Sequence, residues 1–180
     1  VYGKLYLPTP VKRDSSWVVL GIFATPVKDN LLEWLAEVQG LKDSLWEGAV
    51  LQLSIKYTDE YNNIPPTVTF NTIPFHPNVD QNSGRPCIDF LDNPKEWNGK
   101  LTMSSILLAI QVMLSNPELE NAVNVEAAEM LKNNISLYRQ MVIQCVRTSQ
   151  HPEGSLIQTN LSLGHTRLSL VQIKGFLNSN

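Results

Sequence analysis

The residues with the clearest chemical potential lie in the segment His76–Phe90, which reads HPNVDQNSGRPCIDF. Cys87 follows a run of turn-forming residues, Asp80–Pro86, and such residues place a chain at the protein surface. A thiol presented there could act as a nucleophile. Cysteine is also among the most buried residue types, so a small buried side chain is the competing interpretation.

The neighbouring polar residues narrow the chemistry that Cys87 could perform. His76 is the obvious candidate base, but Pro77 restricts it, and we expect it to hold the loop together by hydrogen bonding. The side-chain amide of Asn78 could donate to a developing oxyanion or could serve as a turn residue, and the residues favour neither. These groups suggest acyl transfer through a thioester, or a thiol hydrolase. A cysteine protease would need a paired histidine, and the remaining ones, His151 and His165, lie in a weakly patterned C-terminal stretch.

Composition indicates one globular domain. The 180 residues are 43% hydrophobic and 17% charged, with a formal net charge of −3. The absence of a Lys/Arg cluster argues against nucleic-acid binding. The two cysteines fit neither a disulfide framework nor a metal-ligand spacing, so we expect reduced thiols and a cytoplasmic or nuclear location. The apolar run Trp17–Ala24 is too short to span a bilayer, and we expect no membrane association.

Four segments have the character of β-strands. The clearest is Val50–Tyr57, in which apolar residues alternate strictly with polar ones. Leu31–Val38 is ambiguous between helix and strand, but its length and the following Gly40 favour a strand. The remaining two segments are apolar or β-branched: Val18–Ala24 and Thr67–Asn71. Short turns between the four predict an antiparallel meander.

Helices are expected after a long irregular stretch over residues 72–101. Thr102 is a plausible N-cap for a helix that ends before Pro117. Asn124 can cap a second helix, and a third runs from about Ser136 to Thr148, with Cys145 on its apolar side. Strands followed by helices predict the α+β class. We expect an irregular segment over 1–16, a core domain over 17–150 and a poorly ordered tail over 151–180.

Several motifs together resemble the ubiquitin-conjugating enzymes. In chain order they are YNNIPPTVTF at Tyr61–Phe70, HPN at 76–78, CIDFL at Cys87–Leu91, Trp97, and a helix ending in LSNP at Pro117. The resemblance covers about residues 20–148, and the combination is far more specific than HPN alone. It implies a UBC-like fold, with an N-terminal helix, a four-stranded antiparallel β-meander, and helices packed after the active-site loop.

The resemblance implies a role for each matching residue. Cys87 would accept the C-terminus of ubiquitin as a thioester, from an activating enzyme that uses ATP, and would pass it to a substrate lysine. Asn78 would stabilise the oxyanion, whereas His76 and Pro77 would be structural. Asp89 would lie close to the site. No bound cofactor or metal is implied.

The lysine step requires help, because a free lysine amine has a pKa of about 10.4 and is mostly protonated at neutral pH. Many members of the family carry an acidic residue or a serine on the loop after the Asn-Pro helix end. Here that position is Asn121, which can orient an amine but cannot accept its proton. Glu118 or Glu120 could compensate, although we expect both to be ordinary solvated carboxylates.

The partner-binding segments also depart from the family pattern. The resemblance places ligase contacts at Asn63, Pro65, Pro66, Trp97 and Gly99. The chain has Asn62-Asn63-Ile64 where the family has proline and an aromatic residue, and Asn98-Gly99-Lys100 where it has Pro-Ala. We therefore expect a weaker or different contact with a RING-type ligase; a HECT-type ligase is the other partner class.

Two alternatives remain for the function. Pro8 and Pro10 interrupt the family's first helix, so the chain could be a ubiquitin-binding module that charges poorly; Cys87 with an intact HPN motif argues against this. The chain could also carry a ubiquitin-like modifier, and no sequence feature excludes that.

Overall fold

The computed structural model describes residues 21–28 and 30–150. Its elements are β1 Ile22–Val27, β2 Asn30–Gln39, β3 Val50–Lys56, β4 Thr67–Phe70, α2 Asp89–Asp92, α3 Met103–Ser115, α4 Val125–Asn133 and α5 Ile135–Ser149. The predicted segment 1–16, the expected N-terminal helix and the tail 151–180 lie outside the described residues. The division into these three parts stays a prediction.

The four strands form one antiparallel sheet in the order β1-β2-β3-β4, as the sequence predicts. Strict alternation in β3 points Leu51, Leu53 and Ile55 into the core, and all three are fully buried. The ambiguous segment is a strand: Ala36 pairs with Leu53 of β3. The prediction of an α+β fold with a four-stranded meander is therefore confirmed.

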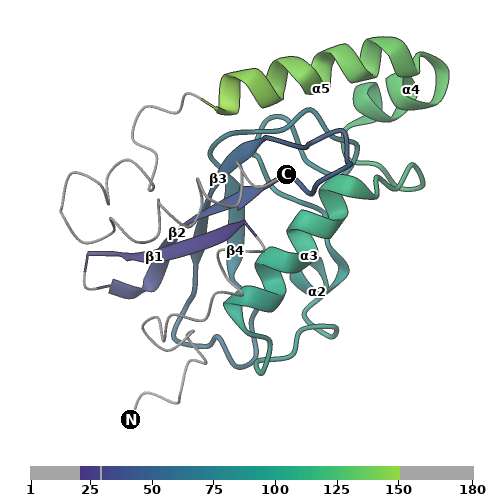
Figure 1. The fold of residues 1–180 in the computed structure, drawn as a ribbon. Coiled ribbons are helices and arrows are strands. Elements are labelled where there is room, and N and C mark those ends of the chain that lie inside the picture. Colours follow the sequence, from purple (N-terminus) through teal and green to yellow (C-terminus); the bar gives the residue numbers. More distant parts are fainter. Residues whose placement is uncertain (1–20, 29, 151–180) are drawn as a thin grey trace, which may run out of the picture.

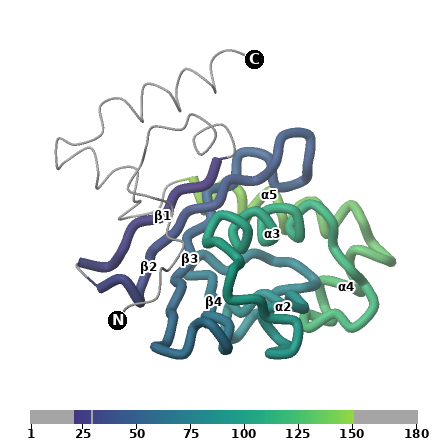
Figure 2. Tube along the Cα trace, turned by 90° about the horizontal axis from the view of Figure 1, so that it is seen from below, coloured from purple at the N-terminus to yellow at the C-terminus, as the bar shows by residue number. Residues whose placement is uncertain are grey.

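Helix α3 crosses one face of the sheet and closes the core (Figure 1). Its N-cap is Thr102, whose side chain accepts a hydrogen bond from the Ser105 N–H at 3.1 Å, as predicted. One stripe of the helix is fully buried, and includes Ile106, Leu107 and Ile110. The view in Figure 2 shows α2 and α4 on the side of the molecule away from β1.

Helix α5 runs along the top of the molecule and is tied to the sheet at its C-terminal end (Figure 1). The Ser149 hydroxyl accepts a hydrogen bond from the Val50 N–H at 3.0 Å. At the other end, Asn134 accepts from the Leu137 N–H. The predicted N-cap Asn124 likewise accepts from the Ala127 N–H at 3.0 Å. These caps fix where α4 and α5 begin, and the cap at Asn124 therefore sets where the loop between α3 and α4 ends.

The long stretch between β4 and α3 is held closely against the sheet. The Phe70 N–H donates to the Gly84 carbonyl at 2.8 Å, and Val79 forms an antiparallel bridge with Pro86. Gly84 has a φ of 69°, and a Cβ there would come within 2.5 Å of the Phe70 carbonyl oxygen. Only glycine fits this close approach. The loop that precedes Cys87 is thereby pinned to β4.

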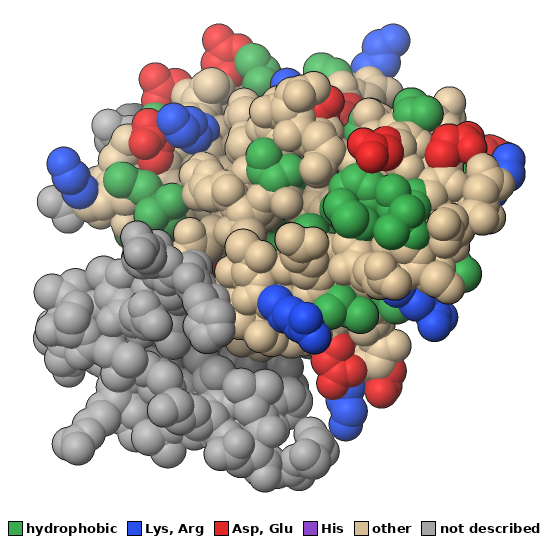
Figure 3. Space-filling view, turned by 90° about the horizontal axis from the view of Figure 1, so that it is seen from above, with side chains coloured by type: hydrophobic (Ala, Val, Ile, Leu, Met, Phe, Trp, Pro, Cys, Tyr) green, Lys and Arg blue, Asp and Glu red, His purple; other side chains and the backbone are tan. Residues whose placement is uncertain are grey.

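The face above α5 carries several exposed apolar side chains (Figure 3). The exposed large apolar side chains of α5 are Ile135, Leu137 and Ile143. A shallow groove lies between α5 and the segment after β4, and Cys145 lines it with Ile73, Phe75 and Met141. No helix within residues 21–28 and 30–150 combines the length and the apolar character needed to cross a membrane.

Candidate active site

Cys87 is exposed at the end of the pinned loop, so the structure answers the question of its burial. Its N–H donates to the Asn78 carbonyl at 2.8 Å. Upstream, the Asp80 carboxylate accepts hydrogen bonds from the Ser83 N–H and hydroxyl at 2.6 and 2.7 Å, which closes the turn. The thiol is thus presented on a well-connected backbone.

Carboxylates surround the Cys87 thiol. The short helix α2 begins directly after it, and the Asp92 carboxylate accepts hydrogen bonds from the Ile88 N–H at 2.9 Å and from the Cys87 thiol. Desolvation, followed by that hydrogen bond and by the charges of Asp92, Asp89 and Glu118, raises the pKa of Cys87 to about 11. At neutral pH about one thiol in ten thousand is then ionised. The site does not activate the thiol for attack on unactivated carbonyls.

His76 is fully buried and is not available as a base for Cys87. Its Nδ1 accepts a hydrogen bond from the Asn78 N–H at 3.1 Å, which closes the HPN turn. Burial lowers the pKa of His76 to about 4, although the backbone carbonyls of Leu114 and Met113 favour the protonated ring. The imidazole is therefore neutral at physiological pH and lies in the position expected of a structural residue.

Asn78 joins the HPN turn to the loop after α3. Its Nδ2 donates to the Glu118 carbonyl and its Oδ1 accepts from the Glu118 N–H, both at 2.8 Å. Beside it, the Pro77 carbonyl accepts from the Asn124 N–H at 3.0 Å. The side chain is buried, and one amide hydrogen is committed to Glu118. The predicted oxyanion role remains a prediction, and would use the second amide hydrogen.

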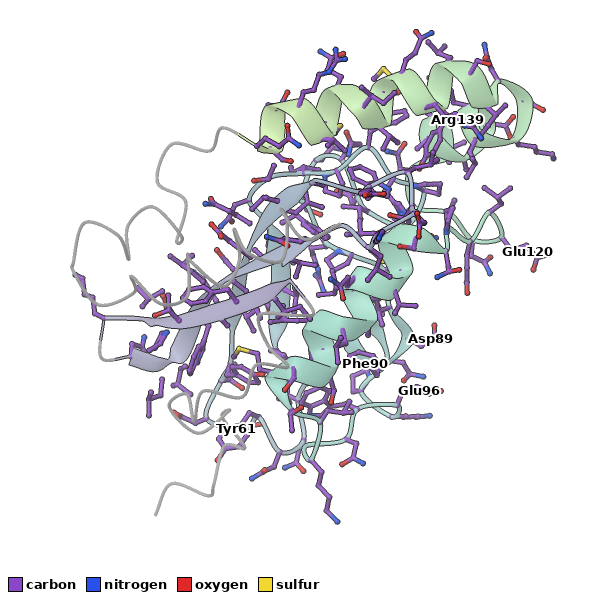
Figure 4. The ribbon with its side chains drawn as sticks, in the orientation of Figure 1. Tyr61, Asp89, Phe90, Glu96, Glu120 and Arg139 are labelled. Carbon is purple, nitrogen blue, oxygen red and sulfur yellow. The ribbon has the colours of Figure 1, made fainter. Side chains whose placement is uncertain are left out.

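The loop after α3 brings Glu118, and not Glu120, into the electrostatic surroundings of Cys87. Figure 4 shows Glu120 projecting outward from this loop, away from Asp89 on α2. Asn121 is exposed, with a φ of 58°, a left-handed conformation that asparagine tolerates well. This backbone preference gives Asn121 a structural reason for its place in the loop.

The predicted ligase-binding residues come from two loops that support each other. The Trp97 indole N–H donates to the Tyr61 carbonyl at 2.9 Å. A Cβ on Gly99 would lie 2.6 Å from the Asn62 carbonyl oxygen, so the loops touch there. Within the first loop, Asn63 is exposed, Pro65 is half-buried and Pro66 is buried. Pro66 therefore shapes this surface without lying on it.

Sequence reasoning missed three features here. Helix α2 is a single turn, too short to show periodicity. The carboxylate of its last residue, Asp92, accepts a hydrogen bond from the Ile88 N–H. The only sequence signal for this hydrogen bond is an aspartate four residues after Ile88. Ile64, which lies between Asn63 and Pro65 in the first of the two predicted ligase-binding loops, is 42% exposed. Among the described residues, no group of three or more His, Cys, Asp or Glu side chains could hold a metal ion.

Comparison with known proteins places this geometry in a family. The ubiquitin-conjugating enzyme family model matches residues 12–146, and the chain belongs to that family. It is similar to ubiquitin-conjugating enzyme E2 U of Macaca fascicularis, with 62% identity over 119 residues. It is also 37% identical over 129 residues to ubiquitin-conjugating enzyme E2 2 of Candida albicans, covering 72% of this chain and 70% of that one.

A solved structure described as a novel ubiquitin-conjugating enzyme has the same fold, with a TM-score of 0.64 and 59% identity. The match covers 69% of this chain and 81% of that chain. The aligned part is 66% of this chain but only 37% of the macaque relative.

The carboxylates around Cys87 predict the direction of a pKa change. In a Cys145→Ala background, the rate of alkylation of Cys87 by iodoacetamide should rise with pH toward a midpoint of about 11. Asp92→Asn removes a negative charge that favours the neutral thiol, so the midpoint should fall and alkylation at pH 7.5 should speed up by about threefold to tenfold. Asp89→Asn, which acts only through its charge, should have a smaller effect. An unchanged midpoint in Asp92→Asn would contradict the hydrogen bond to the thiol.

The Asn78 clamp predicts a loss of stability. Asn78→Ala leaves the Glu118 N–H and carbonyl without their partner, and should lower the free energy of unfolding by about 1–3 kcal/mol. Urea denaturation followed by circular dichroism measures this. The control is Asn116→Ala, an exposed amide that donates to Val112 at 2.9 Å, with an expected change near 0.5 kcal/mol. Equal stability of Asn78→Ala and the unmodified protein would rule out a structural clamp.

Proposed function

We propose that this chain accepts ubiquitin as a thioester on Cys87 from an ATP-using activating enzyme and passes it to a lysine of a protein substrate, usually with a ligase. The observation that carries the proposal is the exposed thiol of Cys87 on a loop fixed by the HPN turn. Membership of the ubiquitin-conjugating enzyme family supports it. The chain itself binds no cofactor in this scheme, since ATP is used by the activating enzyme.

The high pKa of Cys87 fits transfer between thioesters. Attack on an incoming thioester exchanges one C–S bond for another, so the reaction is nearly balanced and needs only a small thiolate fraction. A hydrolase that attacks amides would need a thiolate stabilised by a neighbouring imidazole. His76 is buried and Cys87 is surrounded by acidic groups, which favours the acyl-carrier function over the thiol hydrolase.

A ligase would bind the surface formed by the two loops that Trp97 and Gly99 join. The surface presents Asn63, Ile64 and Pro65, with Trp97 half-buried beside them. Ile64 supplies the exposed apolar side chain that such an interface needs at its centre. The ligase would be of the RING or the HECT type, and the departures at Asn62-Asn63-Ile64 and Asn98-Gly99-Lys100 predict a RING contact that is weaker than, or different from, the family pattern. The reduced thiols favour a cytoplasmic or nuclear location.

A charging assay tests the proposed function. Incubation with activating enzyme, ATP and ubiquitin should give an adduct on a non-reducing gel that a reductant removes. Cys87→Ala should abolish the adduct, because the sulfur that carries the acyl group is gone. The matched control is Cys145→Ala, which lies in the groove beside α5 and should charge normally.

Other outcomes of this assay separate the alternatives. Cys87 could form no adduct with ubiquitin but form one with a ubiquitin-like modifier and its own activating enzyme. That result would mean that the chain carries this modifier and not ubiquitin. No adduct with any modifier would leave a binding module with this fold and would overturn the proposed function.

The ligase surface predicts a separation of two activities. Ile64→Ala should reduce ligase-stimulated discharge of ubiquitin by at least about fivefold, because it removes the exposed apolar side chain at the centre of the interface. Charging should be unchanged. Val125→Ala, which removes a side chain that is 66% exposed on α4, should alter neither activity. Normal ligase stimulation of Ile64→Ala would place the ligase elsewhere on the molecule.

A further inference from the structure

We propose that Asp92 is a catalytic residue of the lysine step: its carboxylate takes the proton of the incoming lysine and returns it to the sulfur of Cys87. This inference rests on the proposed function and concerns the same site. It assigns to α2 the role for which the predicted position, Asn121, has no proton acceptor.

The structure positions the Asp92 carboxylate firmly against the reacting atom. It accepts from the Ile88 N–H at 2.9 Å, and Ile88 is the residue directly after Cys87. The Asp92 N–H donates to the Ile88 carbonyl at 3.0 Å, so backbone and side chain both hold the turn. The carboxylate also accepts a hydrogen bond from the Cys87 thiol. Asp92 is exposed, and a substrate can reach it.

In the resting protein, the Asp92 carboxylate accepts a hydrogen bond from the Cys87 thiol. Formation of the thioester on Cys87 removes the proton of that hydrogen bond. A thioester sulfur has no hydrogen, so the carboxylate loses its donor at the moment when the electrophilic carbon is attached to that sulfur. A lysine ammonium approaching the carbon can supply the missing donor. The vacant acceptor thus lies beside the atom that the amine must attack.

The step balances in protons and electrons. The ammonium gives a proton to the Asp92 carboxylate, and the freed nitrogen lone pair forms a bond to the thioester carbon. The amine's second proton is lost as the carbon–sulfur bond breaks and the electron pair of that bond returns to Cys87. The sulfur takes up one proton through Asp92, the other passes to water, and an amide and a neutral thiol remain. The raised pKa of the thiol makes its sulfur a strong acceptor for that proton.

The other candidate acceptors are less well placed than Asp92. Asp89 and Glu118 influence the thiol only through their charge. Glu120 projects outward from its loop (Figure 4). His76 is fully buried behind the HPN turn. Among these groups, Asp92 alone raises the pKa of Cys87 through a side-chain hydrogen bond as well as through its charge, and its carboxylate is held at 2.9 Å from the N–H of the residue after Cys87.

The test measures lysine discharge separately from loading. In a Cys145→Ala background, the chain is charged with ubiquitin, the activating enzyme is quenched, and loss of thioester to free lysine is followed with time. Asp92→Asn should charge but discharge at least about tenfold more slowly at pH 7.5, within the range of general base catalysis. Asp92→Glu, which keeps a carboxylate, should recover part of the rate. Asp89→Asn and Glu118→Gln are the matched charge controls and should lose less than threefold.

A pH profile separates proton transfer from a structural effect. As the pH approaches about 10.4, free lysine is increasingly neutral and no longer needs a base. The difference in discharge rate between Asp92→Asn and the unmodified protein should therefore shrink as the pH rises. If the substitution only distorted the site, the difference would remain at high pH. Equal discharge of the two proteins at pH 7.5, or an equal loss in all three carboxylate variants, would overturn the inference.

A second loading route keeps this test independent of the proposed function. Cys87 can be acylated by a small acetyl thioester without an activating enzyme, and aminolysis of that acyl group by lysine can be followed by mass spectrometry. The same order of variants is expected. If ubiquitin charging fails but acetyl aminolysis still depends on Asp92, the proposed function is wrong and the role of Asp92 stands. If charging succeeds and Asp92→Asn discharges normally by both routes, only the role of Asp92 is wrong.

Discussion

The site depends on the pair of hydrogen bonds between the Asn78 side chain and the backbone of Glu118. This pair joins a turn that lies between the sheet and Cys87 to a loop that begins where α3 ends. The Cys87 N–H bonds to the carbonyl of the same asparagine. One residue therefore sets the position of the thiol and of a carboxylate 40 residues away in sequence. A buried amide with both partners satisfied is rigid, because each lost bond leaves an unpaired group.

The acidic groups around Cys87 disfavour attack by its free thiol and favour attack by a lysine amine on an acyl group that Cys87 would carry. Carboxylates on α2 and on the loop after α3 disfavour the thiolate, which slows attack by the free thiol. The same charges attract a lysine ammonium and help the departing sulfur to recover a proton. In the proposed function, this charge pattern would hold the acyl group on Cys87 against other thiols and release it to amines. The slower attack by the thiol would matter little there, because the proposed donor is already a thioester.

Secondary-structure elements with a periodic sequence pattern could be predicted from the sequence, whereas contacts between residues far apart in the sequence could not. Strict alternation in Val50–Tyr57 and the caps at Thr102 and Asn124 identify β3, α3 and α4 correctly, because each signal lies within a few residues. The sequence predicts the first strand at Val18–Ala24, but it is described as Ile22–Val27. The motifs also locate the exposed thiol. The clamp from Asn78 to Glu118 joins residues that no local pattern relates. Helix α2, which ends at Asp92, has only four residues and is too short to show a helical pattern in the sequence. The position of the Asp92 carboxylate beside Cys87 is therefore visible only in the folded structure.

The proposed role of Asp92 would give the site a proton acceptor on α2, although Asn121 on the loop after α3 cannot accept a proton. Asn121 has a left-handed backbone, which asparagine and aspartate both tolerate, but its amide cannot accept a proton. In the role proposed for Asp92, the acceptor comes from another element, one that ends near the sulfur. Helix α2 begins one residue after Ile88, and its last side chain turns back to the Ile88 N–H. This hydrogen bond places the Asp92 carboxylate beside the thiol and requires no change in the HPN turn. The carboxylate can therefore be supplied by a different element while the backbone that presents Cys87 stays the same.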